Sequence, residues 1–422
     1  MDEKLLQYIW KNQLFDGLHA TTTDGIELLL INTGTINSNS GPDFFNAKIR
    51  IGDTLWVGCV ELHLRASDWN LHKHQNDAAY SNVILHVVYE NDTDILDKKG
   101  NPIPTLELKP LIKQDLIAQY NYYMSSQLEI VCQNQFESVP SQVIGSCLNK
   151  MLVERLENRK TTIDSILDAN YNHKEEAFYQ ILATSFGFKT NSEPFGLLAK
   201  SLPLSILGKH KSDLLQIEAL LFGLAGFLDV EPTDDYTAKL QREYLFLKQK
   251  FSLSPLCECK IWKFSKTYPS GFPTIRIAQF AALIHQSSAL LSKILEVNTI
   301  DELIDLFTVT ASDYWTNHFK MGVQSNQSFA KSLGITAIHS LIINTVLPFM
   351  YAYGRWNDNI TYIDKCICFY SDLPLEDNTI VRKYNVLREF SSALHSQGLL
   401  QLYNIYCKPK RCLDCRIGIH IL

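Results

Sequence analysis

Histidine and acidic residues gather in one short part of the chain. Four of the twelve histidines fall within 24 residues: His63, His72, His74 and His86. Glu61 comes just before them, and Asp43 lies 18 positions before Glu61. If residues 44–51 and 56–64 pair as a hairpin, Asp43 lies at the start of one strand and near Glu61 and His63 at the end of the other. Glu61 and His63, two positions apart, then share one strand face.

Such a pair of carboxylates predicts a metal site. Converging carboxylates suit a hard divalent ion such as Mg²⁺ or Mn²⁺ and leave coordination positions for water and a phosphate oxygen. His63 could then ligate the ion, orient a water or act as a base. Simpler interpretations stay open. Gly41-Pro42-Asp43 is also an ordinary turn, His86 lies in an apolar run typical of a core histidine, and the segment 72–74 could be a solvated turn.

The surrounding residues predict the elements that would position this site. Leu5, Leu6, Ile9 and Trp10 recur at helical spacing. The runs that follow indicate strands, with Gly52-Asp53-Thr54 as a tight turn between the second and third. The expected strands cover 25–31, 44–51, 56–64, 83–89 and 103–108, with a helical stretch over 67–80. We therefore expect an α-β-β-β-α-β order with one extra strand in a domain spanning 1–110.

These motifs carry a resemblance. Gly41-Pro42-Asp43, followed by Val60-Glu61-Leu62-His63 in this strand order, resembles the restriction-endonuclease-like core of the PD-(D/E)xK nucleases. Gln75-Asn-Asp-Ala-Ala-Tyr80 resembles the Q-x4-Y helix motif of that superfamily. The resemblance implies a metal-dependent nuclease acting on nucleic acid, with Asp43 and Glu61 as metal ligands and Gln75 and Tyr80 supporting the site.

One position departs from the superfamily pattern. His63 stands where these nucleases have a lysine, and a neutral imidazole supplies no permanent positive charge to the transition state. Two other functions therefore stay open: a catalytically degenerate nuclease fold that binds nucleic acid or protein, and a metal-dependent hydrolase of another substrate. Over its whole length the chain also resembles an uncharacterised bacterial family, chiefly in Gly41–Tyr89, Trp262–Gln279 and the cysteine tail.

The tail predicts a second metal site. Cys407, Cys412 and Cys415 fall within nine residues and are followed by His420. The spacing C-x4-C-x2-C-x4-H could form a Cys₃His zinc site. Metal binding would then stabilise the fold of a short segment that has no hydrophobic core of its own. Cys147 or Cys366 is an alternative fourth ligand. Three carboxy-terminal cysteines and one distant cysteine also resemble the iron–sulfur clusters of some nucleases of this superfamily. Unliganded or redox-active thiols stay open as well.

After Pro110 the apolar residues recur with the period of an α-helix. We expect a helical domain over 111–405 and a separate cysteine-rich tail over 406–422, so that the fold class is α+β. The expected helices cover 111–130, 140–168, 174–186, 213–228, 235–251, 274–295, 300–309, 335–353 and 379–400. Gly223 indicates a tightly packed helix pair. Arg276, at the start of its helix, suits either a bound phosphate or ordinary packing.

Charge and hydropathy exclude several classes of protein. The net charge is −6, and residues 1–110 hold 15 acidic against 9 basic side chains, so nonspecific binding of nucleic acid through a large basic face is not expected. The acidic start is unlike a signal peptide, and the most apolar run, Ile335–Tyr353, is interrupted by polar residues and indicates a buried helix. We expect a cytoplasmic protein with no membrane segment; the sequence predicts no oligomeric state.

Overall fold

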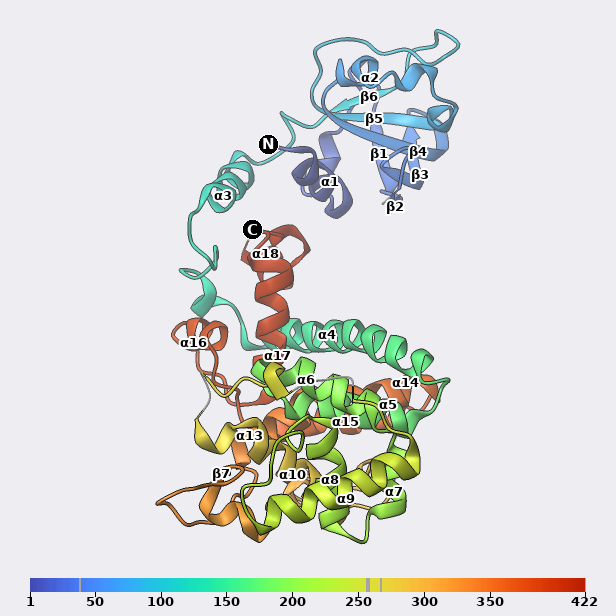
Figure 1. Ribbon diagram of the computed structural model, residues 1–422. Coiled ribbons are helices and arrows are strands. Elements are labelled where there is room, and N and C mark those ends of the chain that lie inside the picture. Colours follow the sequence, from blue (N-terminus) through green and yellow to red (C-terminus); the bar gives the residue numbers. More distant parts are fainter. Residues whose placement is uncertain (38, 256–258, 266–267, 422) are drawn as a thin grey trace. The chain divides into compact units, whose positions relative to one another are not determined.

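The structure is a computed structural model that describes residues 1–421 apart from 38, 256–258 and 266–267. It contains two compact units. The first unit consists of Met1–Cys147 and Tyr403–Leu422, and the second unit consists of Leu148–Leu402. Figure 1 shows a sheet-containing region early in the chain and a larger helical region after it, so the predicted mixed α+β class is confirmed.

The two units divide the chain differently from the expected boundaries at 110 and 405. Helix α3 (Gln114–Ser125) follows Pro110 but packs with the sheet, since Ile117 and Tyr120 belong to the same hydrophobic core. Leu413 of the tail packs against that core as well. The change of period at Pro110 therefore marks a change of secondary structure and not the end of a packing unit.

One six-stranded sheet organises the first unit. Its order is β1-β3-β4-β5-β6, with β2 paired to β3. The strands are β1 (Leu28–Asn32), β2 (Thr35–Ile36), β3 (Phe44–Ile51), β4 (Thr54–Arg65), β5 (Val83–Glu90) and β6 (Thr105–Glu107). The predicted hairpin is confirmed: β3 and β4 pair antiparallel from Ile51↔Thr54, and Gly52 takes the positive φ of 55° that this tight turn requires. Strands β5 and β6 continue the sheet in parallel.

Helix α1 (Glu3–Asn12) covers one face of this sheet. Asp2 caps the helix by accepting a hydrogen bond from the backbone N–H of Leu5. Buried side chains of α1, among them Leu6 and Trp10, join the inward side chains of β3, β4 and β5 in one core. Because side chains alternate along a strand, Val60 and Leu62 of β4 enter this core. Glu61 and His63 consequently point to the opposite face.

The opposite face carries a compact turn region. It contains helix α2 (Asp68–Leu71) and the 3₁₀ turns η2 (His74–Asn76) and η3 (Ala78–Tyr80). Trp69 is only 1% exposed and packs in a small core with Ala66 and Val88. This packing holds the segment from His72 to Tyr80 over the outer side of β4 and β5.

The second unit is helical over most of the residues that the structure describes. Its helices beyond α4 (Ser141–Ala169) are α5 (Lys174–Phe186), α6 (Phe188–Ser201), α7 (Leu204–His210), α8 (Leu214–Leu224), α9 (Asp235–Phe251), α10 (Pro273–Gln286), α11 (Leu290–Glu296), α12 (Ile300–Phe307), α13 (Ile335–Leu341), α14 (Leu347–Trp356), α15 (Ile360–Asp372), α16 (Thr379–Asn385) and α17 (Ala393–Gln401). A two-stranded ribbon, β7 (His318–Lys320) and β8 (Val323–Gln324), is also present.

Several details of this unit test the sequence predictions. Gly223 of α8 lies so close to α9 that an added Cβ would come within 2.1 Å of the Tyr244 ring, which confirms the tight helix pair. Arg276 stacks its guanidinium 4.5 Å from the Phe188 ring centre and donates to Gln279, contacts that fit the packing interpretation. The helical stretch Ile335–Trp356 is long and apolar enough to span a membrane, but 67% of its most apolar window is buried, as in a core helix.

Candidate metal centre

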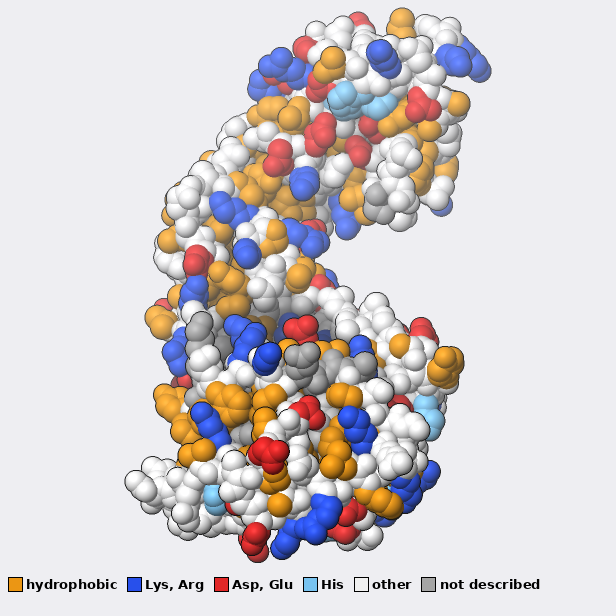
Figure 2. Space-filling model, viewed as in Figure 1, with side chains coloured by type: hydrophobic (Ala, Val, Ile, Leu, Met, Phe, Trp, Pro, Cys, Tyr) orange, Lys and Arg blue, Asp and Glu red, His pale blue; other side chains and the backbone are white. Residues whose placement is uncertain are grey.

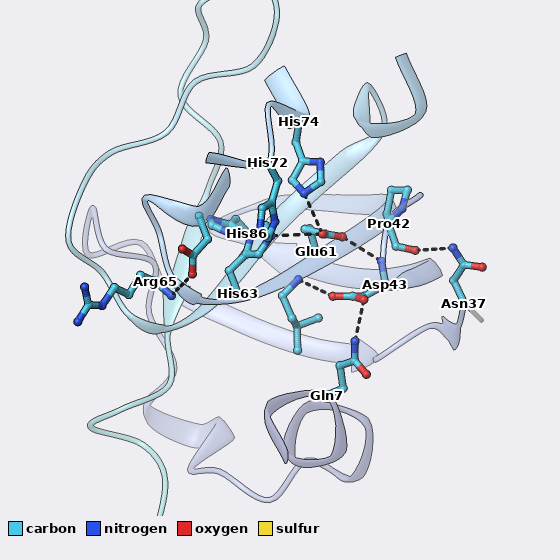
Figure 3. A network of polar contacts seen from close by, with 12 residues as sticks. Gln7, Asn37, Pro42, Asp43, Glu61, His63, Arg65, His72, His74 and His86 are labelled. Atoms are coloured by element: carbon cyan, nitrogen blue, oxygen red, sulfur yellow. Dashed lines mark hydrogen bonds and ion pairs between the residues drawn. The ribbon is translucent and has the colours of Figure 1, made fainter. Parts of the chain in front are cut away.

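The β3–β4 hairpin brings the carboxyl groups of Asp43 and Glu61 side by side. Glu61 Oε2 accepts a hydrogen bond from the Asp43 backbone N–H at 3.0 Å. Asp43 in turn accepts from the Leu62 backbone N–H at 3.0 Å and from Gln7 Nε2 of α1 at 2.8 Å (Figure 3). Both oxygens of Asp43 and one oxygen of Glu61 are therefore held in place, and Glu61 Oε1 is left facing the histidines.

Two histidine rings approach this remaining oxygen, and a third ring lies beside one of them. Glu61 Oε1 lies 3.6 Å from His63 Nε2 and 3.5 Å from His74 Nε2. His63 Nε2 also lies 3.2 Å from His72 Nδ1. One ligand atom from each of the three histidines lies within 4.8 Å of the others. Figure 3 shows the rings approaching Glu61 from β4 and from the turn region above it.

These separations fit a metal ion of ordinary size. Donor atoms bound to Zn²⁺ at tetrahedral corners lie about 3.3–3.6 Å apart, because their bonds to the metal are about 2.0–2.2 Å long. Three separations between neighbouring donors, 3.2, 3.5 and 3.6 Å, fall at or close to this range. His63, His72 and His74 could therefore hold one ion, with Glu61 Oε1 beside two of the three imidazoles.

His86 supports this donor set from the neighbouring strand. Its Nε2 lies 2.8 Å from Nδ1 of His63, and both rings are buried. A proton on His63 Nδ1, donated to His86, leaves the lone pair of His63 Nε2 facing Glu61. Metal-binding histidines are commonly fixed by such a second hydrogen bond. His86 is thus a buried, hydrogen-bonded core histidine, as its apolar neighbours in sequence indicated, and it lies directly behind the site.

Burial dominates the electrostatics of the site. It raises the pKa of Asp43 to about 6 and, together with the nearby charge of Asp43, raises the pKa of Glu61 to about 8. Burial also lowers the pKa of His63 to about 2 and that of His86 to about 3. The imidazoles of His63 and His86 are therefore neutral, which is the form that binds metals. A divalent cation would oppose the shifts of the two carboxyl groups, because it favours their ionised forms.

Aromatic side chains frame the site on the side of the turn region. The Tyr80 ring stacks on His74 with centres 3.8 Å apart, and Trp69 meets the same imidazole edge-on at 5.4 Å. The predicted supporting residue Gln75 lies in η2, where its Oε1 is buried without a hydrogen-bond partner among the described residues. His72 is exposed, and Figure 2 shows histidine side chains at the surface of this unit beside acidic ones. The donor set is thus open to solvent on one side.

Sequence reasoning brought Asp43, Glu61 and His63 together but left the roles of His72 and His74 open. Asp43, Glu61 and His63 lie together, as the predicted hairpin requires. For His72 and His74, the sequence also allowed a solvated turn with no role in metal binding. The His72-Lys73-His74 spacing was the available signal, because a short turn can aim both rings at one point. A set of three imidazoles and one carboxylate favours a transition metal such as Zn²⁺ or Mn²⁺ over Mg²⁺.

The structure also places the residues of the predicted tail site. Cys407, Cys412 and Cys415 belong to the first unit, and their thiol neighbours there include Cys132 and Cys147. His420 lies in helix α18 (Arg416–Ile421) and is exposed. Cys366 belongs to the second unit, where its thiol donates to the Leu347 carbonyl at 3.3 Å.

Comparison with known proteins gives a family for this chain. The family described as Protein of unknown function (DUF2851) matches residues 3–379. The chain belongs to this family. The DUF2851 match includes Asp43, Glu61 and all four histidines around the candidate metal centre, and it ends before Cys407. No curated protein and no solved structure matches the chain.

Proposed function

We propose that the first unit is a divalent-metal-dependent hydrolase of the PD-(D/E)xK kind that cleaves phosphodiester bonds in nucleic acid. The observation that carries this proposal is the cluster of ring nitrogens of His63, His72 and His74, with Glu61 Oε1 3.6 Å from His63 and 3.5 Å from His74. A cation held there would polarise a phosphoryl oxygen and lower the pKa of a bound water to near neutrality.

The order of elements supports the choice of phosphodiester chemistry. Helix α1, the strands β1, β3 and β4, the turn region with α2, and the parallel strand β5 follow one another in an α-β-β-β-α-β order, to which the two-residue strand β2 is an addition. Asp43 precedes β3, and the Glu61-Leu62-His63 triplet lies on β4. The positions of Asp43 and Glu61 in the sheet support the proposed likeness to the acidic positions of the nuclease motif.

The side chains have distinct roles in this proposal. Glu61 and the three histidines hold the ion, so His63 acts as a ligand and not as the base that its sequence position also allowed. Asp43 fixes Glu61 through its backbone N–H and adds negative charge beside the ion. Gln7 orients Asp43 from α1. Because His72 is exposed, a substrate can approach from the solvent side.

A cleavage assay tests the proposal. Labelled single-stranded DNA, double-stranded DNA and RNA are incubated with the full chain and Mn²⁺, Zn²⁺ or Mg²⁺. We expect cleavage with Mn²⁺ and a fall of about 100-fold or more for Glu61→Ala and His74→Ala, because the loss of a ligand removes several kcal/mol of transition-state stabilisation. His19→Ala is the matched control, since His19 is an exposed histidine of the same unit that pairs with Asp16 at 2.7 Å.

One observation favours a second function. His63 replaces the superfamily's lysine and is buried and neutral, so the site lacks that permanent positive charge. A degenerate fold that binds nucleic acid without cutting it would have this property. If wild type retains labelled nucleic acid in a mobility-shift assay but cleaves none of the three substrates with any of the metals, the hydrolase proposal is wrong and the binding function replaces it.

The excess of acidic side chains in residues 1–110 favours a third function, hydrolysis of a substrate less highly charged than nucleic acid. The chromogenic diester bis(p-nitrophenyl) phosphate separates the two hydrolase hypotheses. Metal-dependent release of nitrophenol, lost in His74→Ala, together with no cleavage of DNA or RNA would keep the metal chemistry and reject nucleic acid as the substrate.

A further inference from the structure

Five cysteines from three separate segments gather in the first unit. They are Cys132, Cys147, Cys407, Cys412 and Cys415. The thiols of Cys147 and Cys415 are hydrogen-bonded to each other, and the sulfur of Cys132 lies within electrostatic range of those of Cys407, Cys412 and Cys415. Cys412 and Cys415 are neighbours as well. Residues more than 250 positions apart in sequence are therefore neighbours in this unit.

Contacts that involve no thiol hold the tail in this position. Lys410 Nζ donates to the carbonyls of Met124 at 2.9 Å and Ser126 at 2.7 Å. Gln119 of α3 donates to the Ile421 carbonyl at 2.9 Å. The tail is thus tied to the segment just before Cys132 by backbone acceptors, and the thiols are brought together by the fold itself.

The burial of these sulfurs identifies the kind of ligand that would suit them. Cys147 and Cys415 are buried, and Cys132, Cys407 and Cys412 are partly buried. Enclosed sulfurs of this kind suit a thiophilic metal, which displaces the thiol protons because a coordinating thiol is deprotonated by the metal charge.

We propose that Cys132, Cys407, Cys412 and Cys415 are the four ligands of a thiolate-bound metal centre. Four thiolates are the usual ligand set for both a tetrahedral zinc ion and an iron–sulfur cluster. Each ligand loses its proton to solvent as its sulfur–metal bond forms. Cys132 replaces His420 of the C-x4-C-x2-C-x4-H interpretation, because His420 is exposed while Cys132 lies among the tail thiols.

Cys147 has a different role in this proposal. Its thiol donates a hydrogen bond to the sulfur of Cys415 and accepts one from the backbone N–H of Ile417. A hydrogen bond to a ligand sulfur tunes a metal centre without completing it. Cys147 is therefore a positioning residue, and its loss should weaken the centre without abolishing it.

Metal analysis of the full chain, purified without oxygen, tests the proposal. Beyond any ion at the histidine centre, we expect either about one thiolate-bound zinc per chain in a colourless protein or iron with acid-labile sulfide and a visible absorption band. Cys132→Ser, Cys407→Ser, Cys412→Ser and Cys415→Ser should each lower that metal content about tenfold, whereas Cys147→Ser should retain it with lower affinity. Cys59→Ser, which alters another buried cysteine of the same unit, is the matched control.

Two further measurements keep the outcome decisive. His72→Ala should leave the thiol-bound metal in place, which separates this centre from the histidine centre and from the proposed hydrolase. Adding Co²⁺ to the wild-type chain tests for thiolate coordination without the use of any variant, since cobalt bound by thiolates gives intense charge-transfer bands. A wild-type chain that holds no zinc or iron, and shows no such bands after Co²⁺ is added to the reduced protein, overturns the proposal. Full metal content in Cys132→Ser overturns the assigned ligand set.

Discussion

At the scale of single residues, the candidate metal centre depends on which nitrogen of each imidazole points inward. His63 could present either ring nitrogen to Glu61, and the 2.8 Å contact with His86 selects Nε2. This arrangement was not predictable from sequence, because β4 and β5 are joined by a long turn region and their parallel register places His86 opposite Glu61 only in three dimensions. The same holds for Gln7, which reaches Asp43 from α1.

His86 gives a direct prediction at this scale. His86→Leu removes the acceptor that fixes His63, and we expect the affinity for Zn²⁺ to fall about 10- to 100-fold. His86→Gln, which retains an acceptor oxygen, should keep most of that affinity. Competition with a chromophoric chelator measures both. Equal affinities for wild type and the leucine variant would show that His86 is only a core residue.

Glu218 gives a second prediction, in the second unit. This buried carboxyl accepts hydrogen bonds from Ser312 at 2.7 Å and Tyr236 at 3.0 Å, and burial raises its pKa to about 7. The native state therefore keeps a proton that the unfolded state loses near pH 4.5, and stability falls as the pH rises from about 4.5 to 7.

Glu218→Gln should remove this pH dependence. The wild-type chain should lose up to roughly 3 kcal/mol between pH 4.5 and 8 from this group, and the variant should not. Urea denaturation at both pH values, followed by circular dichroism, measures the difference. Parallel pH profiles for wild type and variant would rule out the shifted carboxyl as a source of the pH dependence.

At the scale of secondary structure elements, hydrophobic periodicity predicted where most helices and strands lie but was less accurate about the residues at which they begin and end. The strands β3, β4 and β5 and the helices α4, α5 and α9 match their expected ranges within a few residues. The expected helix over 274–295 is divided at Ala289, which has a positive φ of 55°. Helices α6, α7 and α15 were not predicted, since Pro194 and polar residues interrupt their apolar spacing and tertiary packing decides their fold.

The α8–α9 contact gives the prediction that belongs to this scale. Gly223→Ala places a methyl group against the Tyr244 ring, so we expect a loss of about 1–3 kcal/mol in the stability of the second unit. Gly208→Ala in α7 is the control, because an added Cβ there meets no atom within 4 Å and alanine favours the helix. Thermal unfolding compares the two variants; equal midpoints would mean that the helices separate easily.

At the scale of the whole molecule, both proposed metal centres belong to the first unit. Metal removal should therefore act on one part of the chain. Saturation at 100 times the dissociation constant stabilises a folded state by about 2.7 kcal/mol, so a chelator should lower the unfolding midpoint of the first unit and leave that of the second unit unchanged. Calorimetry with EDTA or added Zn²⁺ measures this, and Gly223→Ala identifies the transition of the second unit. Equal shifts of both transitions would contradict the assignment of both metal centres to the first unit.

The discontinuous first unit has a consequence for the order of events during translation. Residues 403–422 complete this unit, but the ribosome adds them only after the entire second unit has been made. Domains generally fold as they emerge, and synthesis proceeds at about 5–20 residues per second. The helical unit can therefore fold while the sheet unit still waits for its last segment. A nascent chain acquires the cysteines of its tail, and with them any metal they bind, only after the helical unit has been made.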